Sequence, residues 1–384
     1  MPSFLDRLIG GRSNAPAEQK SQTYFALTDL GAAQWSRRGF VALANEGFAK
    51  NPVVYRCVRM IAEAANRVPL TVREDGREMS VHPVLDLINR PNPHQSGPEL
   101  LESLYAYLQT AGNAYLEAAI VEGEVRALYG LRPDRMKVVA GKDGWPEAYD
   151  YTAGGKTMRL SQSADPVARV LHLTLFHPLD DHYGLAPLEA AQVSLDTHNS
   201  AANWNKSLLD NAARPSGALV YSAASGNLSA DQFERLKAEL EQGFQGAANA
   251  GRPMVLEGGL DWKTLALSPR DMDFIAVKNA AAREIALAFG VPPMLLGIPG
   301  DNTYANYAEA NRTFWRQTIV PLVRRVAASL GHWLNPGFEG DFEIIPDIGQ
   351  IEALAEDRTA LWQRVNAATF LDDAEKRALV GLGE

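Results

Sequence analysis

The spacing of apolar residues first predicts a helix that begins near Asn51. Asn51 is a favoured N-cap residue, and Pro52 follows it in the first turn, where the missing N–H of proline costs nothing. Cys57 and Ile61 then recur at helical spacing, so this face of the helix is predicted to enter the core. The preceding segment, residues 1–45, is polar and punctuated by Gly and Ser, and we interpret it as a flexible arm.

Residues 46–183 combine strand and helix patterns. Alternating apolar positions predict several short strands, joined by tight turns near Gly76 and Gly123. Residues 97–112 instead repeat their apolar side chains at helical spacing. We therefore interpret this region as an α/β domain.

A long and polar helix is predicted from Pro187 to Ala213. Such a helix would span roughly 40 Å. Its apolar seam is thin, and most of its other positions hold Asn, Ser, Gln or Asp. A helix this polar needs similar helices or a water-filled space beside it, because one narrow apolar stripe cannot make it the core helix of a lone globule.

A second long helix, over residues 271–290, ends in a run of helix-breaking residues. A glycine closes it, and two adjacent prolines prevent its continuation. The next helix begins within residues 301–303, which are all N-cap types, and runs to Leu334 with a proline inside, where a kink is predicted. The positions predicted to act as hinges are Gly290, Pro292, Pro293 and Pro321.

Between the two long helices, residues 216–268 carry the pattern of a small insertion. It begins with a strand, continues with a helix and ends with two more strands. Ser229 and Gln232 have the spacing of a capping box at the start of this helix. After the last long helix, a short strand and two small helices complete the chain.

Composition and charge narrow the possible classes of protein. The 384 residues are 46% hydrophobic and 22% charged, which is typical of a soluble globular protein. The formal net charge of −9 argues against a protein that grips DNA by broad phosphate neutralisation, although it permits one that lets DNA pass. The single cysteine, Cys57, excludes an intrachain disulfide, and no segment has the pattern of a secretory signal or a membrane span. We expect that the protein does not associate with a membrane. We expect it to assemble in the cytoplasm.

Two motifs invite an enzymatic interpretation. "GGKT" at residues 154–157 lacks the glycine that a phosphate-binding loop needs five positions earlier, where Asp150 stands, so it is better explained as a turn. The second motif, which could hold a metal in a hydrolase, consists of His172, His177, Asp180, Asp181 and His182. Loop His and Asp side chains more often hydrogen-bond locally. We expect no catalytic residue, metal or cofactor, and a metal-dependent hydrolase remains the alternative.

Six short stretches carry a family resemblance when they are taken in order. They are "RPNP" (90–93), "GNAY" (112–115), "YGLAPLEAA" (183–191), "RPSG" (214–217), "FGVPPMLLG" (289–297) and "NYAEANRTFW" (306–315). With them the chain resembles the portal proteins of tailed double-stranded DNA phages, of the compact kind found in many long-tailed phages. The resemblance extends from about Asn51 to Leu382, and gene transfer agents also carry portals of this kind.

The resemblance implies an α+β portal fold and a ring of about twelve subunits around an axial channel. The fold would comprise an α/β wing, a stem of long helices, a small αβ clip, a kinked C-terminal helix and a reduced helical crown, since the C-terminal region is short. The implied boundaries are 1–45 for the arm, 46–183 for the wing, 184–215 and 269–290 for the stem helices, 216–268 for the clip, 291–302 for the tunnel loop, 303–349 for the kinked wing helix and strand, and 350–384 for the short C-terminal region.

The resemblance also implies which residues meet DNA and partners. A tunnel loop projecting towards DNA would contain Leu295, Leu296, Gly297, Ile298, Pro299, Gly300, Asp301 and Asn302. The channel-lining stem residues would include Asn199, Asn203, Lys206 and Lys278. The exposed face of the clip helix, where partners dock, would include Glu234, Lys237, Glu241 and Gln245. A mostly neutral, Asn- and Ser-lined wall would let DNA slide, whereas a cationic wall would bind its phosphates tightly.

The expected function is that of a structural channel at one vertex of a capsid. Double-stranded DNA would enter through it during packaging and leave during delivery, without sequence specificity. The implied partners are further copies of the chain, the major capsid protein, the large terminase and a head-tail adaptor. The protein would reside in the virion after assembly in the bacterial cytoplasm. A monomeric adaptor or scaffold is a further alternative.

Overall fold

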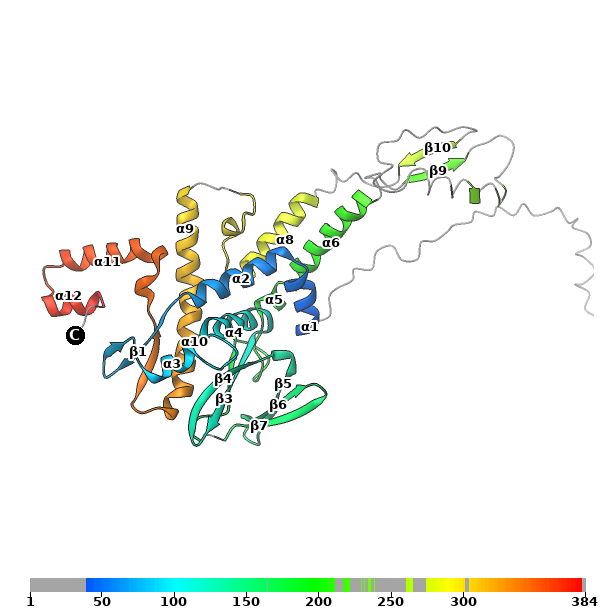
Figure 1. Ribbon diagram of the computed structural model, residues 1–384. Coiled ribbons are helices and arrows are strands. Elements are labelled where there is room, and N and C mark those ends of the chain that lie inside the picture. The colour runs from blue at the N-terminus through cyan, green and yellow to red at the C-terminus, as the bar shows by residue number, and fades with distance from the viewer. Residues whose placement is uncertain are drawn as a thin grey trace, which may run out of the picture. The chain divides into compact units, whose positions relative to one another are not determined.

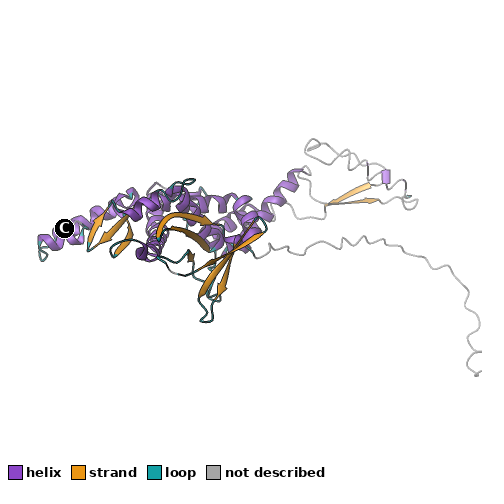
Figure 2. Ribbon diagram, turned by 60° about the horizontal axis from the view of Figure 1, so that its bottom comes forward, coloured by secondary structure: helices purple, strands orange, loops and turns teal. Residues whose placement is uncertain are grey.

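The fold is α+β, built from helices and several small sheets (Figure 1). The computed structural model describes residues 39–163, 165–210, 217–221, 229, 231, 234, 235, 238, 260–264, 274–300 and 304–381. Figure 2 shows the strands gathered into small separate sheets beside the helices. Of the helices within these ranges, none has the length and apolar character needed to cross a membrane.

The predicted first helix is confirmed. It follows the short helix α1 (Phe40–Leu43) and a π-helical segment (Ala44–Ala49), and it forms α2 (Pro52–Asn66). The Oδ1 atom of Asn51 accepts hydrogen bonds from the N–H groups of Val53 and Val54 at 3.0 and 3.1 Å and thereby caps α2. Cys57 and Ile61 are fully buried, as their spacing predicts.

Three small sheets are antiparallel in every strand pairing of the described wing region, which makes this region α+β rather than α/β. Strands joined by tight turns pair antiparallel, since a parallel pair requires a long crossover connection. The first sheet has the order β11-β1-β2, with β1 (Leu70–Glu74), β2 (Arg77–Met79) and β11 (Phe342–Pro346). The second has the order β4-β3-β8, with β3 (Asn113–Val121), β4 (Glu124–Leu131) and β8 (Val170–Thr174). The third has the order β5-β6-β7, with β5 (Met136–Ala140), β6 (Pro146–Ala153) and β7 (Lys156–Ser161).

The tight turns predicted near Gly76 and Gly123 are confirmed. Gly76 and Gly123 have φ values of 80° and 78° and close the β1–β2 and β3–β4 hairpins. Gly154 and Gly155, with φ values of 57° and 74°, close the β6–β7 hairpin, which confirms that "GGKT" is a turn between strands.

The helices between the strands bury most of their apolar faces in one core. They are α3 (Pro83–Asn89) and α4 (Gly97–Ala111), and α4 packs on α2. Ser96 and Glu99 form a complete capping box at the start of α4, and Gly112 ends the helix in the left-handed conformation. The same core contains the inward face of α10 (Val320–Leu334), so the N-terminal and C-terminal parts of the wing fold together.

The predicted helix from Pro187 to Ala213 is interrupted in the structure. It consists of α5 (Pro187–Ala190) and α6 (Gln192–Asp210), and residues 211–213 lie outside the described ranges. The two pieces bring Leu188 and Leu195 together into the core, where a Cβ on Gly47 would lie 2.7 Å from Leu188 Cδ1. Helical hydrogen bonds continue across the interruption, from Ala191 N–H to Pro187 O at 3.0 Å and from Leu195 N–H to Ala191 O at 2.8 Å.

The second long helix is α8 (Phe274–Ala288), and the insertion contributes β9 (Gly217–Tyr221) and β10 (Leu260–Thr264). These two strands pair antiparallel, in agreement with the strands predicted near both ends of the insertion.

The helix that contains Pro321 is interrupted by a π-helical turn. It comprises α9 (Tyr304–Phe314), the turn Trp315–Ile319 and α10, which follow one another along one line in Figure 1. Pro321 has no N–H to donate to the carbonyl of Gln317. One residue earlier, the N–H of Val320 bonds to Trp315 O, five residues back, rather than to the carbonyl four residues back. At the proline where the sequence predicts a kink, the structure has a widened π-helical turn immediately before it. Two small helices, α11 (Ala355–Ala367) and α12 (Asp373–Leu379), follow β11 as predicted.

Candidate functional site

The candidate site is the pair of long helices α6 and α8, which lie side by side (Figure 1). Ser194 Oγ donates a hydrogen bond of 2.5 Å to Glu284 Oε2 and ties the first turns of α6 to the last turns of α8. The residues of α8 that pack inward are small or aliphatic, namely Ala281, Ala282, Ile285 and Ala286. Small side chains let the backbones of neighbouring helices approach closely, so they allow α8 to pack closely against its neighbours.

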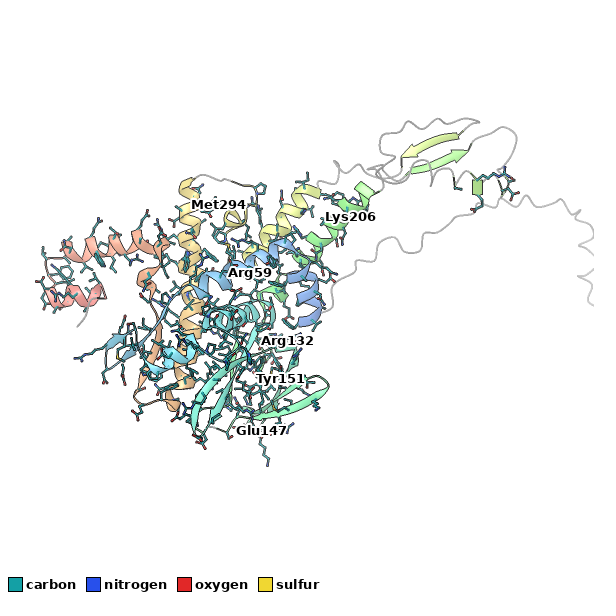
Figure 3. All side chains as sticks on the ribbon, viewed as in Figure 1. Arg59, Arg132, Glu147, Tyr151, Lys206 and Met294 are labelled. Carbon is teal, nitrogen blue, oxygen red and sulfur yellow. The ribbon has the colours of Figure 1, made fainter. Side chains whose placement is uncertain are left out.

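Two of the predicted channel-lining residues lie on exposed parts of α6. Asn203 and Lys206 are both exposed, and Figure 3 shows Lys206 on this helix. Lys278 on α8 is half-buried, and it lies close enough to His198 for its charge to act on that imidazole. The arrangement is compatible with a polar wall, and the channel-lining role of these three residues stays a prediction.

Asn199, the fourth predicted channel-lining residue, makes hydrogen bonds within the subunit. Its Nδ2 donates to the carbonyl of Glu46 at 3.0 Å, and its Oδ1 accepts from Asn51 Nδ2 at 2.8 Å. Both ends of the amide are therefore used inside the subunit, where they join α6 to the segment that precedes α2. These bonds give Asn199 a structural role within the subunit, and its place in the channel lining stays a prediction.

His198 completes this polar cluster. Its Nδ1 lies 3.0 Å from Asn51 Nδ2, and because an amide nitrogen can only donate, Nδ1 accepts and the imidazole is neutral. Burial lowers the pKa of His198, and the positive charge of Lys278 lowers it further. Asn51 therefore caps one helix and holds another, a double role that its N-cap position in the sequence does not reveal.

The stem pair also exposes large apolar side chains. Val193, Ile275 and Leu287 leave 62%, 74% and 78% of their surface accessible, respectively. Isolated exposed hydrophobic residues are common, and each of these three is a position that a neighbouring chain would favourably cover.

Part of the predicted tunnel loop belongs to the core. Pro293–Leu296 form a 3₁₀ turn, and Figure 3 shows Met294 within it, after α8. Leu295 and Leu296 pack against the core cluster, and Ile298 is 8% exposed. These three side chains are anchors, so the expectation that they project outwards is corrected. Gly297, Pro299 and Gly300 are exposed, and Asp301 and Asn302 lie outside the described residues.

The end of the loop is joined to α8. The Nη2 atom of Arg283 donates to the carbonyl of Pro299, and a Cβ on Gly300 would lie 2.7 Å from the same nitrogen. Arg283 was not among the residues predicted from the sequence, since nothing in its local pattern links it to a glycine that follows 17 positions later.

The predicted hinges lie at well-defined points of the backbone. Gly290 has φ 66°, its carbonyl accepts from Thr318 Oγ1 at 2.6 Å, and a Cβ there would lie 2.8 Å from that oxygen. Pro292 and Pro293 begin the 3₁₀ turn, and Pro321 follows the π-helical turn that contains Thr318. The start of the loop is therefore fastened to the turn before Pro321. Whether these residues act as hinges stays a prediction.

The structure describes one of the four clip residues predicted to dock partners. Glu234 is helical and exposed. Lys237, Glu241 and Gln245 lie outside the described residues, as does Gln232 of the predicted capping box.

The histidine cluster does not form a metal site. His172 is held on β8 between Asn113 Oδ1, 3.0 Å from its Nε2, and the hydroxyl of Tyr149, 3.4 Å from its Nδ1. His177 accepts from the N–H of Leu179, and Asp180 accepts from the N–H groups of two residues that follow it. No three His, Cys, Asp or Glu side chains converge within the described ranges. The hydrolase alternative therefore lacks its site.

The half-buried His172 makes stability depend on pH. Burial, with a smaller contribution from His182, lowers its pKa to about 3, whereas an unfolded chain has a histidine pKa of about 6.5. Between these values the unfolded state binds more protons, so acidification favours unfolding. Lowering the pH from 7 to 5 is expected to remove about 1–2 kcal/mol of unfolding free energy through this residue.

Denaturant unfolding of the wild type and His172→Gln at both pH values measures this effect. The variant should be less stable at pH 7. On acidification it should lose about 1–2 kcal/mol less unfolding free energy than the wild type, because glutamine does not titrate. The loss that arises from His198 is common to both proteins. Equal losses in the two proteins would show that His172 does not titrate as its burial requires.

Two of the sequence landmarks meet where the wing joins the stem. Gly184 of "YGLAPLEAA" lies directly against Gly112 of "GNAY": a Cβ on Gly184 would lie 2.1 Å from Gly112 O. Asn113 Oδ1 accepts from Gly184 N–H at 2.8 Å, and Leu175 N–H donates to Gly112 O at 2.8 Å. The residues before α5 are thus bonded to the end of α4 and the start of β3, which fixes the direction in which the stem leaves the wing.

Comparisons with known proteins agree with this architecture. A family model described as "Phage portal protein" matches residues 52–381. The portal protein of Enterobacteria phage HK97 is 26% identical over an alignment that covers 90% of this chain and 78% of the phage protein.

Solved structures of gene transfer agent (GTA) particles are more similar. A chain in the neck of an empty GTA particle, computed with C6 symmetry, is 54% identical, with 93% of this chain and 97% of that chain covered and a TM-score of 0.73. A chain in the neck of a native particle, computed with C12 symmetry, is also 54% identical, with 92% and 96% covered and a TM-score of 0.70. Portal proteins have a structural role, which excludes the hydrolase alternative. The chain belongs to the phage portal protein family.

Proposed function

We propose that the chain assembles into a ring of about twelve subunits at one vertex of a phage-like or GTA particle, and that the ring conducts double-stranded DNA. The observation that carries this proposal is the α6–α8 pair. It is anchored in the wing core at one end, yet it exposes Val193, Ile275 and Leu287 next to polar residues. The twelvefold symmetry of the similar GTA neck supports the number of subunits.

The polar residues of the pair suit a conduit. Asn203 and Lys206 are exposed on α6, and the chain as a whole carries a formal charge of −9. A wall with few cations avoids the strong counterion-driven binding that a moving DNA could not escape. The exposed loop residues Gly297, Pro299 and Gly300 would then lie nearest the DNA, with Ile298 as their anchor.

The remaining segments receive the roles that a portal requires. Residues 46–183 and 303–349 would form the wing, and residues 216–268 the clip, on which the large terminase and then a head-tail adaptor dock. The major capsid protein would surround the ring in the virion, and assembly would take place in the bacterial cytoplasm. The short region 350–384 would form a reduced crown.

The mass of the assembled protein tests the ring directly. Native mass spectrometry of the purified chain at micromolar concentration should give about 500 kDa, because about twelve chains of 41.9 kDa form a closed ring. Leu287→Glu should shift the mass towards the single subunit, since it places a charge in the proposed interface. Val121→Glu, on an exposed strand end in the wing, is the matched control and should leave the ring intact. A wild-type mass of 41.9 kDa would contradict the proposal.

A further inference from the structure

The exposed end of the loop after α8 is held by one basic side chain. Arg283 lies on the exposed side of α8, and its Nη2 donates to the carbonyl of Pro299. Gly300, the next residue, has no side chain, and a Cβ there would come within 2.7 Å of the guanidinium. The guanidinium of Arg283 therefore bonds to the Pro299 carbonyl and occupies the position where a side chain on residue 300 would begin.

The rest of the described loop is held by other contacts. The N–H of Gly297 bonds to Met294 O at 3.2 Å, and the N–H of Ile298 bonds to Pro293 O at 3.3 Å. Ile298 itself is buried. Among the described residues these backbone contacts end at Ile298, and Arg283 bonds the next residue, Pro299, to the stem. The position of Pro299 and Gly300 relative to α8 therefore depends on this guanidinium.

A guanidinium has better partners than a peptide carbonyl. It presents five N–H donors in a planar fork, which matches the oxygens of a phosphate. A hydrogen bond to a charged phosphate is roughly twice as strong as one to a neutral acceptor. Because Arg283 is exposed, its charge is accessible to a phosphate that comes close to Pro299. The bond to the carbonyl would then compete with the bond to the phosphate.

We propose that Arg283 holds the loop end against the stem through the Pro299 carbonyl and exchanges that carbonyl for a backbone phosphate when DNA occupies the channel. This inference rests on the proposed function for its second half, since DNA must reach the loop. The first half concerns a contact within one chain and is independent of ring formation. Arg283 is thus a positioning residue whose partner changes with DNA.

Hydrogen exchange at the Gly297 and Ile298 amides, which bond to Met294 O and Pro293 O, tests the first half. In Arg283→Gln these amides should exchange roughly five-fold faster than in the wild type, because the loop can open locally without first breaking the arginine bond. Arg283→Lys should give an intermediate rate, since one ammonium keeps the charge but loses the fork. Arg126→Gln removes another exposed arginine, on β4, and is the matched control, with no change expected at these amides. Equal rates in Arg283→Gln and the wild type would overturn the proposal.

A short double-stranded DNA of mixed sequence tests the second half on the assembled protein. In the wild type, DNA at low salt should accelerate exchange at Ile298, and high salt should reverse the effect. In Arg283→Gln the rate should already be high and should not respond to DNA. A wild-type loop that does not respond to DNA would overturn the exchange of partners. If no ring forms, the proposed function fails, yet the comparison without DNA still decides whether Arg283 holds the loop.

Discussion

Gly184→Ala is expected to prevent correct folding at the junction of wing and stem, and with it ring assembly. A Cβ at this position would lie 2.1 Å from Gly112 O and 2.6 and 2.7 Å from the backbone N and O of Leu175. All three are backbone atoms of packed segments, so none can move aside without breaking the bonds of the junction. The expected loss is about 3 kcal/mol or more of unfolding free energy, measured by denaturant titration.

Gly123→Ala is the matched control for this prediction. Gly123 has φ 78°, and nothing lies within 4 Å of a Cβ built on it. The alanine should cost only about 1 kcal/mol, the penalty of a left-handed conformation, and the variant should still assemble. If Gly184→Ala were as stable as Gly123→Ala, the close contact between the two landmark glycines would not be essential to the fold.

Replacing residues 299–303 with an alanine-rich helical segment is expected to allow ring assembly but block packaging. The buried Ile298 stays in place, so the core contacts of the loop are kept. The new segment would extend α9 towards the N-terminus and remove the Pro299–Gly300 turn that faces the stem. We expect the number of DNA-filled particles to fall by roughly 100-fold, because the loop could no longer change its conformation as DNA passes.

A flexible control separates stiffness from sequence. A Gly/Ser segment of the same length removes the same side chains but keeps the freedom of the backbone, and it should retain most of the packaging. Both variants should have the native mass of the wild type. Normal packaging by the helical variant would show that these residues do not act on the DNA.

The sequence predicted the elements whose signals are local. Asn51 with Pro52, the glycine turns and the adjacent Pro292 and Pro293 carry their structural meaning within a few residues, and the structure confirms the elements that they start or end. The polar character of the helix after Pro187 also pointed to an assembly, because it follows from composition and spacing alone.

Contacts between distant residues could not be predicted in the same way. Asn199 reads as a polar surface residue, yet it bonds to Asn51 and to Glu46 across about 150 positions. Arg283 and Gly300 have no pattern in common, and the absence of a Cβ at Gly300 matters only after the loop has folded back. Leu295, Leu296 and Ile298 are partly or fully buried. Their apolar character is the sequence signal that could have predicted this burial.

An electron cryomicroscopy reconstruction of the assembled protein would show which element surrounds the axis. We expect a closed ring with a central opening, in which α6 and α8 of adjacent subunits pack side by side and Asn203 and Lys206 face the opening. A ring lined by another element, or a particle in which the α6–α8 pair fills a closed interior, would contradict this expectation.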